Sequence, residues 1–211
     1  MLCLAITLIK CKSSYFFLML KNITFKNFIL FCHSIHLHYL CNQDNKDKTM
    51  RKVIGIGETV LDIIFKNGKP IEAVPGGSAF NAMISLGRSG INATFISEAG
   101  NDRVGDYVIN FLKENGVNAD NVNVFPDSKS PLSLAFLDEN NNADYIFYKD
   151  HPHDKLEFSY PEINRDDIVV FGSFFAINPV VRPQVCGFLD YAHERGAILY
   201  YDVNYRASHR N

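Results

Sequence analysis

The sequence predicts an α/β fold in which a parallel β-sheet is flanked by helices. From Arg51 onward, short apolar runs alternate with segments of helical periodicity, an order typical of parallel strands joined by helices. The 211 residues are 47% hydrophobic and 21% charged, ordinary values for a globular protein with a sizeable core. The formal net charge of −2 does not indicate a nucleic-acid-binding surface. Composition thus argues against disordered, collagen-like and disulfide-scaffold classes.

The expected elements follow one another along the chain from Arg51. The strands are β-branched or aromatic runs at 53–56, 60–65, 93–97, 168–171 and 198–201. One helix has apolar side chains at i, i+4, i+7 and i+8 and stops at Gly116; these are Val104, Val108, Phe111 and Leu112. Two further helices are expected at 79–86 and 181–192, and Gly196 closes the second.

Two segments depart from this alternation and predict β-hairpins. Residues 132–137 and 145–148 flank the polar turn 138–143, and residues 64–74 contain an Asn67-Gly68 turn. We expect a small antiparallel sheet with strands at about 64–75 and 132–149, growing out of the α/β body. Such an outgrowth is a candidate lid.

The first fifty residues differ in composition from the rest. They contain no Gly, Pro, Val, Glu or Arg, yet hold four of the five cysteines. We expect residues 1–49 to be a non-native or disordered leader and the domain to cover 50–211, with Met50 as its natural start. A targeting or membrane segment is the alternative, but the apolar runs 1–9 and 13–20 are each ended by a lysine, and each is shorter than the roughly 18 residues of a membrane span. Cys186, alone in the body, suggests a reduced, cytoplasmic protein.

A group of polar residues near the start of the body predicts a polyol site. Gly76 and Gly77 precede a helix, where the backbone can approach a ligand and helical N–H groups are free. Asp62, at the end of a strand run, can accept from two hydroxyls, and Asn81 offers both a donor and an acceptor. A phosphate-binding loop would need a Lys or Arg beside these glycines, and none occurs there. The alternative is a tight turn in which Asn81 satisfies the backbone.

Several motifs in order resemble the ribokinase/PfkB family of carbohydrate kinases. They are Gly55-Ile56-Gly57-Glu58, Asp62, Pro75-Gly76-Gly77-Ser78-Ala79-Phe80-Asn81, Gly90 and Gly100-Asn101-Asp102-Arg103-Val104-Gly105. Met83 departs from the pattern, because a small residue is usual there. Tyr148-Lys149 and Asp202-Val203-Asn204-Tyr205-Arg206 point to the fructokinase and 2-keto-3-deoxygluconate kinase branch. The resemblance runs from about Arg51 to the end and covers only the N-terminal portion of the family.

The resemblance implies a Rossmann-like, ribokinase-like body with a β-sheet lid. Such an enzyme transfers the γ-phosphate of ATP, with Mg²⁺, to a hydroxyl of a small sugar such as fructose. The residues implied to grip the sugar hydroxyls are Asp62, Gly76, Gly77 and Asn81. Lys149 would reach in from the lid, while Asn204 and Arg206 would lie near the far end of the sugar or the transferring phosphate.

The family's Gly-Ala-Gly-Asp segment, which supplies the anion hole and the catalytic base, does not occur in the chain. We therefore expect the base Asp beyond Asn211, no catalytic residue or metal site within the chain, and no firm binding of ATP or Mg²⁺. The chain would be a fragment that holds the sugar-binding half, inactive by itself. A non-catalytic sugar-binding or interaction module is the alternative. The lid is a candidate interface for a homodimer, and no nucleic-acid or membrane partner is expected.

Other patterns carry weaker hypotheses. Gly55-x-Gly57 after a strand suggests a dinucleotide loop, but Val60 stands where the third glycine belongs. His151 and His153 are expected in a solvated loop. Phe174 and Phe175 follow a strand, where one could stack on a sugar and core packing is the alternative.

Overall fold

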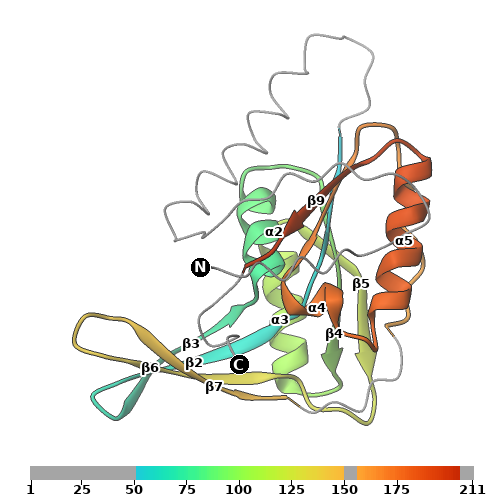
Figure 1. Ribbon diagram of the computed structural model, residues 1–211. Coiled ribbons are helices and arrows are strands. Elements are labelled where there is room, and N and C mark those ends of the chain that lie inside the picture. Colours follow the sequence, from blue (N-terminus) through green and yellow to red (C-terminus); the bar gives the residue numbers. More distant parts are fainter. Residues whose placement is uncertain (1–50, 150–155, 205–211) are drawn as a thin grey trace, which may run out of the picture.

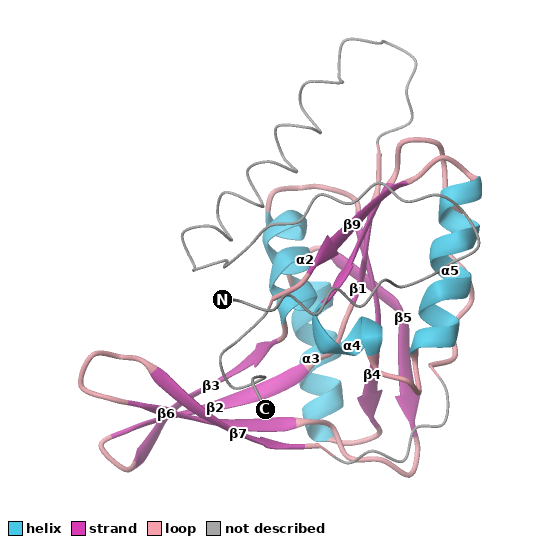
Figure 2. Cartoon of the chain, viewed as in Figure 1, coloured by secondary structure: helices cyan, strands magenta, loops and turns pink. Residues whose placement is uncertain are grey.

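The computed structural model describes residues 51–149 and 156–204, which form two sheets and their flanking helices (Figures 1 and 2). The expectations for residues 1–49, His151, His153 and Arg206 concern positions outside these ranges. Among the described residues, no helix is long and apolar enough to cross a membrane.

Sheet A is the parallel sheet that the sequence predicts. Its strand order is β5-β4-β1-β8-β9, and every neighbouring pair is parallel. The strands are β1 (Val53–Ile56), β4 (Ala93–Gly100), β5 (Val117–Phe125), β8 (Ile168–Gly172) and β9 (Ile198–Asp202). The helices are α2 (Ser78–Arg88), α3 (Arg103–Glu114), α4 (Ser173–Ile177) and α5 (Arg182–Glu194).

Sheet A has a core on each face because side chains alternate along its strands. One core contains Val53 and Phe95 with Phe80 and Met83 of α2, and the other contains Ile54 and Ile96 with side chains of α5. Met83, the departure from the family pattern, is fully buried over the first strand. A Cβ at Gly55 would lie 2.5 Å from its Cγ, so the missing side chain at Gly55 makes room for the larger residue.

Sheet B is the lid, built from both predicted hairpins. Its strands are β2 (Val60–Lys66), β3 (Lys69–Gly76), β6 (Leu132–Leu137) and β7 (Ala143–Tyr148), in the order β3-β2-β6-β7. Within each hairpin the strands are antiparallel. Asn67 and Gly68, at φ 52° and 73°, form the turn of the first hairpin, as the sequence predicts.

The expectation of a wholly antiparallel lid is wrong, because the central pair, β2 and β6, is parallel. Both strands enter the sheet from the body, and the backbone N–H of Leu61 donates to the carbonyl of Pro131 at 3.0 Å where they begin. Two hairpins that start side by side pair through strands of the same direction. The hairpin tips therefore extend together, away from the body (Figure 1).

Strand β5 was not predicted. It is an edge strand whose sequence is interrupted by Asn and Asp, residues depleted in strands. Only Val117, Ala119 and Val122 are buried. The amides of Asn121 and Asn123 instead donate to the carbonyls of Ser159 and Glu157, at 2.6 and 2.8 Å, so polar side chains fasten the neighbouring segment along this edge.

Candidate functional site

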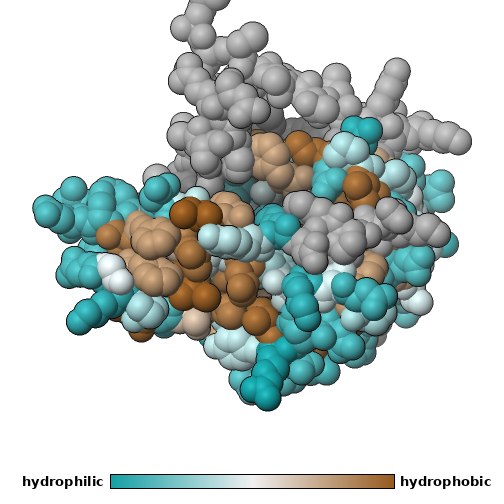
Figure 3. All heavy atoms as spheres, turned by 90° about the horizontal axis from the view of Figure 1, so that it is seen from below, coloured by the Kyte–Doolittle hydropathy of each residue, from teal (hydrophilic) through white to brown (hydrophobic). Residues whose placement is uncertain are grey.

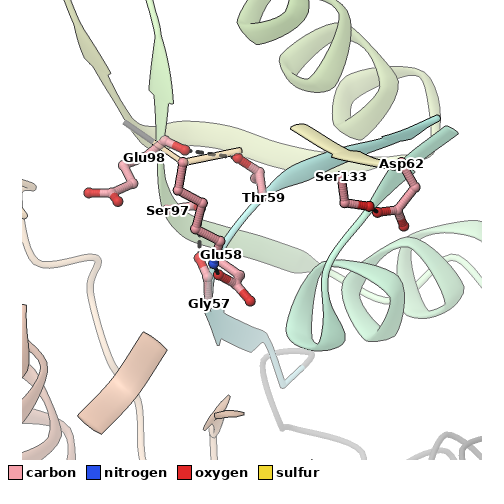
Figure 4. Close-up of polar contacts among 8 residues, drawn as sticks. Gly57, Glu58, Thr59, Asp62, Ser97, Glu98 and Ser133 are labelled. Carbon is pink, nitrogen blue, oxygen red and sulfur yellow. Dashed lines mark hydrogen bonds and ion pairs between the residues drawn. The ribbon is translucent and has the colours of Figure 1, made fainter. Parts of the chain in front are cut away.

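The connection from β1 to β2 carries the chain from the body into the lid. Ser97 Oγ donates to the carbonyl of Gly57 at 2.6 Å, and Thr59 Oγ1 donates to the carbonyl of Glu98 at 2.9 Å (Figure 4). A Cβ at Gly57 would lie 2.7 Å from the Cβ of Ala79. These contacts fix Glu58, which lies between them in the sequence, at the junction of the two sheets.

Asp62 lies in β2 beside the first of the paired glycines. Ser133 Oγ of β6 donates to its carboxylate (Figure 4). A Cβ at Gly76 would lie 2.6 Å from Asp62 Oδ2, so only glycine leaves this oxygen its place. The structure thus brings together two of the predicted sugar-binding residues. Ser133, fully buried, is a partner that the sequence analysis did not identify.

Gly77 is the N-cap of α2 and has φ 130°, a backbone conformation that favours glycine. A Cβ there would collide with the backbone carbonyl oxygen of Glu58. The helix begins with the N–H of Asn81 donating to the Gly77 carbonyl at 2.9 Å. Asn81 is exposed, one turn into α2, and its contact with a sugar remains a prediction.

Asn204 lies just after β9, close to the start of α2. Its backbone N–H donates to Asp202 Oδ1 at 3.1 Å, while Ser78 Oγ donates to Asp202 Oδ2 at 2.6 Å. Asp202 therefore joins the residue after the paired glycines to the segment that holds Asn204. The sequence analysis assigned no role to Ser78. Parallel strands bring such positions together, because the carboxyl ends of β1 and β9 meet at one edge of sheet A.

Lys149, at the end of β7, reaches from the lid to the body. Its Nζ donates to Glu58 Oε2 and lies 5.6 Å from the ring centroid of Phe147. The side chains of the pair are 26% and 29% exposed, so the ion pair is partly shielded from solvent. The sequence predicted the lysine but not its carboxylate partner, which is distant in the sequence.

A pocket with a cavity volume of about 100 Å³ opens around this ion pair. Its walls come from the β1–β2 connection, the ends of β4 and β7, and the α4 region: Glu58, Thr59, Glu98, Pro131, Lys149, Phe174, Phe175 and Asn178. The two aromatic residues have different roles, since Phe175 is 6% exposed in the core and Phe174 is 41% exposed. Phe174 is thus the ring presented to the pocket, and Phe175 mainly packs in the core.

Glu98 is the functional candidate that the sequence analysis missed. The pKa of its carboxyl is raised to about 7, mainly by burial; the Lys149 ammonium lowers this pKa, and the Glu58 carboxylate makes a smaller contribution that raises it. Among the described residues, Oε2 has no hydrogen-bond partner. Its position near the carboxyl end of a buried parallel strand could have drawn attention to it.

The Gly100–Gly105 motif serves the fold. Asp102 is the N-cap of α3 and accepts from the backbone N–H groups of Val104 and Gly105, at 3.0 and 2.9 Å. It also accepts from the N–H and Oγ of Ser130. Although burial acts in the opposite direction, these hydrogen bonds lower the pKa of Asp102.

The described residues bring together no group of three or more His, Cys, Asp or Glu side chains that could hold a metal. We therefore assign no Mg²⁺ ligand among them, and no step of the chemistry is derived through the ion.

Comparison with known proteins gives the same family that the motifs indicate. Residues 50–210 match the pattern of pfkB family carbohydrate kinases. The chain is 26% identical over 173 residues to a probable fructokinase-4 of Arabidopsis thaliana, covering 77% of this chain and 52% of that protein. It is 26% identical over 165 residues to a fructokinase of Solanum tuberosum, covering 73% and 52%. The chain thus spans about half the length of these relatives.

Solved structures share the fold. A fructokinase from Vibrio cholerae O395 superposes with a TM-score of 0.64 at 21% identity, over 75% of this chain and 55% of that one. A sugar kinase from Pyrococcus horikoshii in complex with ATP gives 0.63 at 22% identity, over 74% and 54%. The predicted α/β body with a β-sheet lid is confirmed by these likenesses.

Proposed function

Because the chain belongs to the pfkB family of carbohydrate kinases, we propose that it is the sugar-binding part of an ATP-dependent kinase acting on fructose or a related sugar. The observation that carries this proposal is the position of Asp62 directly over Gly76. A carboxylate beside glycine backbone suits a ligand that presents several hydroxyls at close range.

The proposed binding mode assigns one task to each group. Asp62, oriented by the Ser133 hydroxyl, accepts from sugar hydroxyls. Gly76 and Gly77 let the sugar approach the backbone at the start of α2. Asn81 donates to one hydroxyl and accepts from another. Lys149 closes the site from the lid.

Asn204 and Arg206 complete the proposed site at the far end of the sugar. The hydrogen bond from the Asn204 backbone N–H to Asp202 supports this role, whereas Arg206 lies outside the described residues and is proposed from the family motif alone.

In the proposed reaction the γ-phosphate of ATP passes to one sugar hydroxyl. Such transfer depends on positioning and on neutralising phosphate charge more than on covalent chemistry. ATP with Mg²⁺ supplies the phosphoryl group when bound, and this chain's residues orient the acceptor hydroxyl and exclude water around it. The family's Gly-Ala-Gly-Asp segment does not occur in the 211 residues, so we propose that this polypeptide alone turns over ATP negligibly.

Calorimetry with the 211-residue chain tests the binding role. We expect saturable binding of fructose, and Asp62→Asn weakens it by about tenfold or more, because a hydrogen bond to a charged group contributes roughly 1.5–3 kcal/mol. The matched control is Asp144→Asn, an exposed carboxyl in the same sheet. Unchanged affinity in Asp62→Asn, or loss in both variants, would refute the assignment of Asp62.

An assay of ATP-dependent fructose phosphorylation tests whether this polypeptide is a kinase by itself or only binds sugar. A sugar-binding module gives thermal stabilisation with sugar and none with Mg-ATP, as we expect for this polypeptide. Turnover comparable to that of a full-length relative would overturn the proposal that the chain alone is inactive.

We also propose that two copies associate through the lid. The face opposite Asp62 carries large apolar side chains, since residues paired across strands share a face: Phe136, Ile146 and Tyr148 are 37%, 47% and 57% exposed. Figure 3 shows apolar residues gathered over this part of the molecule. Exposing such an apolar patch to water costs free energy, and a second copy of the chain would cover it.

A further inference from the structure

We propose that the pocket around Glu58, Glu98 and Lys149 makes this site select neutral sugars over sugar acids, and that Glu98 is the residue that sets this preference. The inference rests on the proposed function, because it concerns which class of sugar enters the same site. The family resemblance alone leaves fructose and 2-keto-3-deoxygluconate as alternatives.

The pocket adjoins the paired glycines through Glu58. The backbone carbonyl of Glu58 packs so tightly on Gly77 that a Cβ there would collide with it, while its side chain lies in the pocket wall with Glu98. A sugar seated on the backbone of Gly76 and Gly77 therefore lies beside this wall. Phe174 offers an exposed ring on the α4 side, suited to the apolar face of a sugar.

The charges of the wall do not balance. Two carboxylates, Glu58 and Glu98, face one ammonium, Lys149, and this ammonium is already paired with Glu58. The other lining residues carry no charge: Thr59, Pro131, Phe174, Phe175 and Asn178. A ligand carboxylate would be a third negative group in a partly buried space, where solvent screens charge weakly.

A neutral sugar meets the opposite situation. Glu98 Oε2 is buried and has no hydrogen-bond partner among the described residues, and such an atom costs free energy until a donor reaches it. A sugar hydroxyl provides that donor without adding charge. The same carboxyl that repels a sugar acid therefore stabilises a bound neutral sugar by accepting its hydrogen bond.

The preference depends on pH in a defined direction. Burial raises the pKa of Glu98 to about 7, so the carboxyl is mostly ionised near pH 8 and mostly protonated near pH 6. Glu58 and Lys149 are the charged groups that face it from the β1–β2 connection and from β7. Below the pKa of Glu98 its carboxyl is neutral and the opposite charges of Glu58 and Lys149 cancel, so the repulsion of a sugar acid is reduced.

Calorimetry of the 211-residue chain with fructose and with 2-keto-3-deoxygluconate, at about pH 6 and about pH 8, tests the proposal. At the higher pH we expect fructose to bind at least about tenfold more tightly than 2-keto-3-deoxygluconate, because juxtaposed like charges disfavour the sugar acid. The ratio falls at the lower pH. Glu98→Gln removes the preference at the higher pH, while Glu98→Asp retains it.

The control is Glu114→Gln, which makes the same chemical change at an exposed position at the end of α3 and should leave the ratio unchanged. Equal binding of both sugars by the wild-type chain, or a ratio that does not depend on pH, overturns the inference while the sugar-binding role stands. Absence of binding by either sugar in every variant overturns the proposed function, and the inference with it. The pH comparison needs no variant, so a Glu98 substitution that unfolds leaves the test intact.

Discussion

Ser78 Oγ donates a 2.6 Å hydrogen bond to Oδ2 of Asp202, a residue 124 positions later in the chain. The bond fastens the start of α2, the helix that precedes β4, to the end of β9, and β4 and β9 lie on opposite sides of β1 in the strand order of sheet A. Asp202 also accepts from the N–H of Asn204. One carboxylate thus binds both the residue that follows the paired glycines and the last predicted site residue among those that the structure describes.

Ser78→Ala removes this bond. We expect a loss of about 1–2 kcal/mol in the free energy of unfolding, because Asp202 is half-buried and loses a donor. Urea denaturation measures the change. Ser89→Ala is the matched control, since Ser89 is exposed and its hydroxyl bonds only to the carbonyl of its own helix. Equal effects of the two substitutions would contradict the role of the Asp202 bond.

Gly77→Ala is expected to destabilise the fold by more than about 2 kcal/mol and to abolish sugar binding. The new Cβ meets the Glu58 carbonyl, and φ 130° is a conformation that alanine rarely adopts. Gly90→Ala is the control: its φ is also positive, at 76°, but nothing lies within 4 Å of the added Cβ. Thermal unfolding should show a clearly smaller loss for Gly90→Ala; equal losses would leave conformation alone as the cause.

Asp102→Ala should cost about 1–2 kcal/mol at neutral pH, because an N-cap is lost. The folded pKa of Asp102 is lowered, so its stabilisation is present above the pKa of the unfolded chain and is lost as the pH falls through the folded pKa. The difference between wild type and variant therefore shrinks in acid. Asp106→Ala, at an exposed position in the same helical turn, should change stability less. A pH-independent difference would be evidence against the charged cap.

Lys149→Met should raise the pKa of Glu98 above 7, since the ammonium is the group that holds it down. The carboxyl carbon shift of Glu98, followed by NMR as a function of pH, measures this directly. Lys149→Arg keeps the positive charge and should keep the pKa near that of the wild type. A lower pKa in the methionine variant would show that the ion pair does not govern Glu98.

Ile146→Glu should shift the chain from dimer to monomer in sedimentation velocity, because it places a charge in the apolar lid face. Val180→Glu makes the same change at a similarly exposed position between α4 and α5, 44% against 47%. It should leave the assembly unchanged. If the wild-type chain is monomeric at all concentrations, the proposed lid interface is refuted.

The sequence predicted what depends on neighbouring residues. Apolar runs located four strands of sheet A, and the Asn67-Gly68 pair located a hairpin turn whose positive φ values confirm it. Strand β5 was not predicted, because its pairing with β4 outweighs the poor strand propensity of its polar residues. The parallel pairing of β2 with β6 was not predicted either, because it joins two hairpins that are far apart in the chain.

The same distinction applies to the candidate site. Gly76, Gly77 and Asn81 lie within a stretch of six residues, so their spacing was informative, and Asp62 was marked by its place in a strand. Glu58 and Lys149 are 91 positions apart, and the altered acidity of Glu98 arises from burial among elements that meet only on folding. No local pattern encodes such an environment.

The parallel pairing at the centre of the lid has a mechanical consequence. Sheet B is fixed at the end where β2 and β6 leave the body, and both turns lie at its free end (Figure 2). In a plate clamped along one side, displacement grows with distance from the clamp. Asp62 and Ser133 pair near this fixed side, so a bending of the sheet would displace the hairpin turns far more than these two residues.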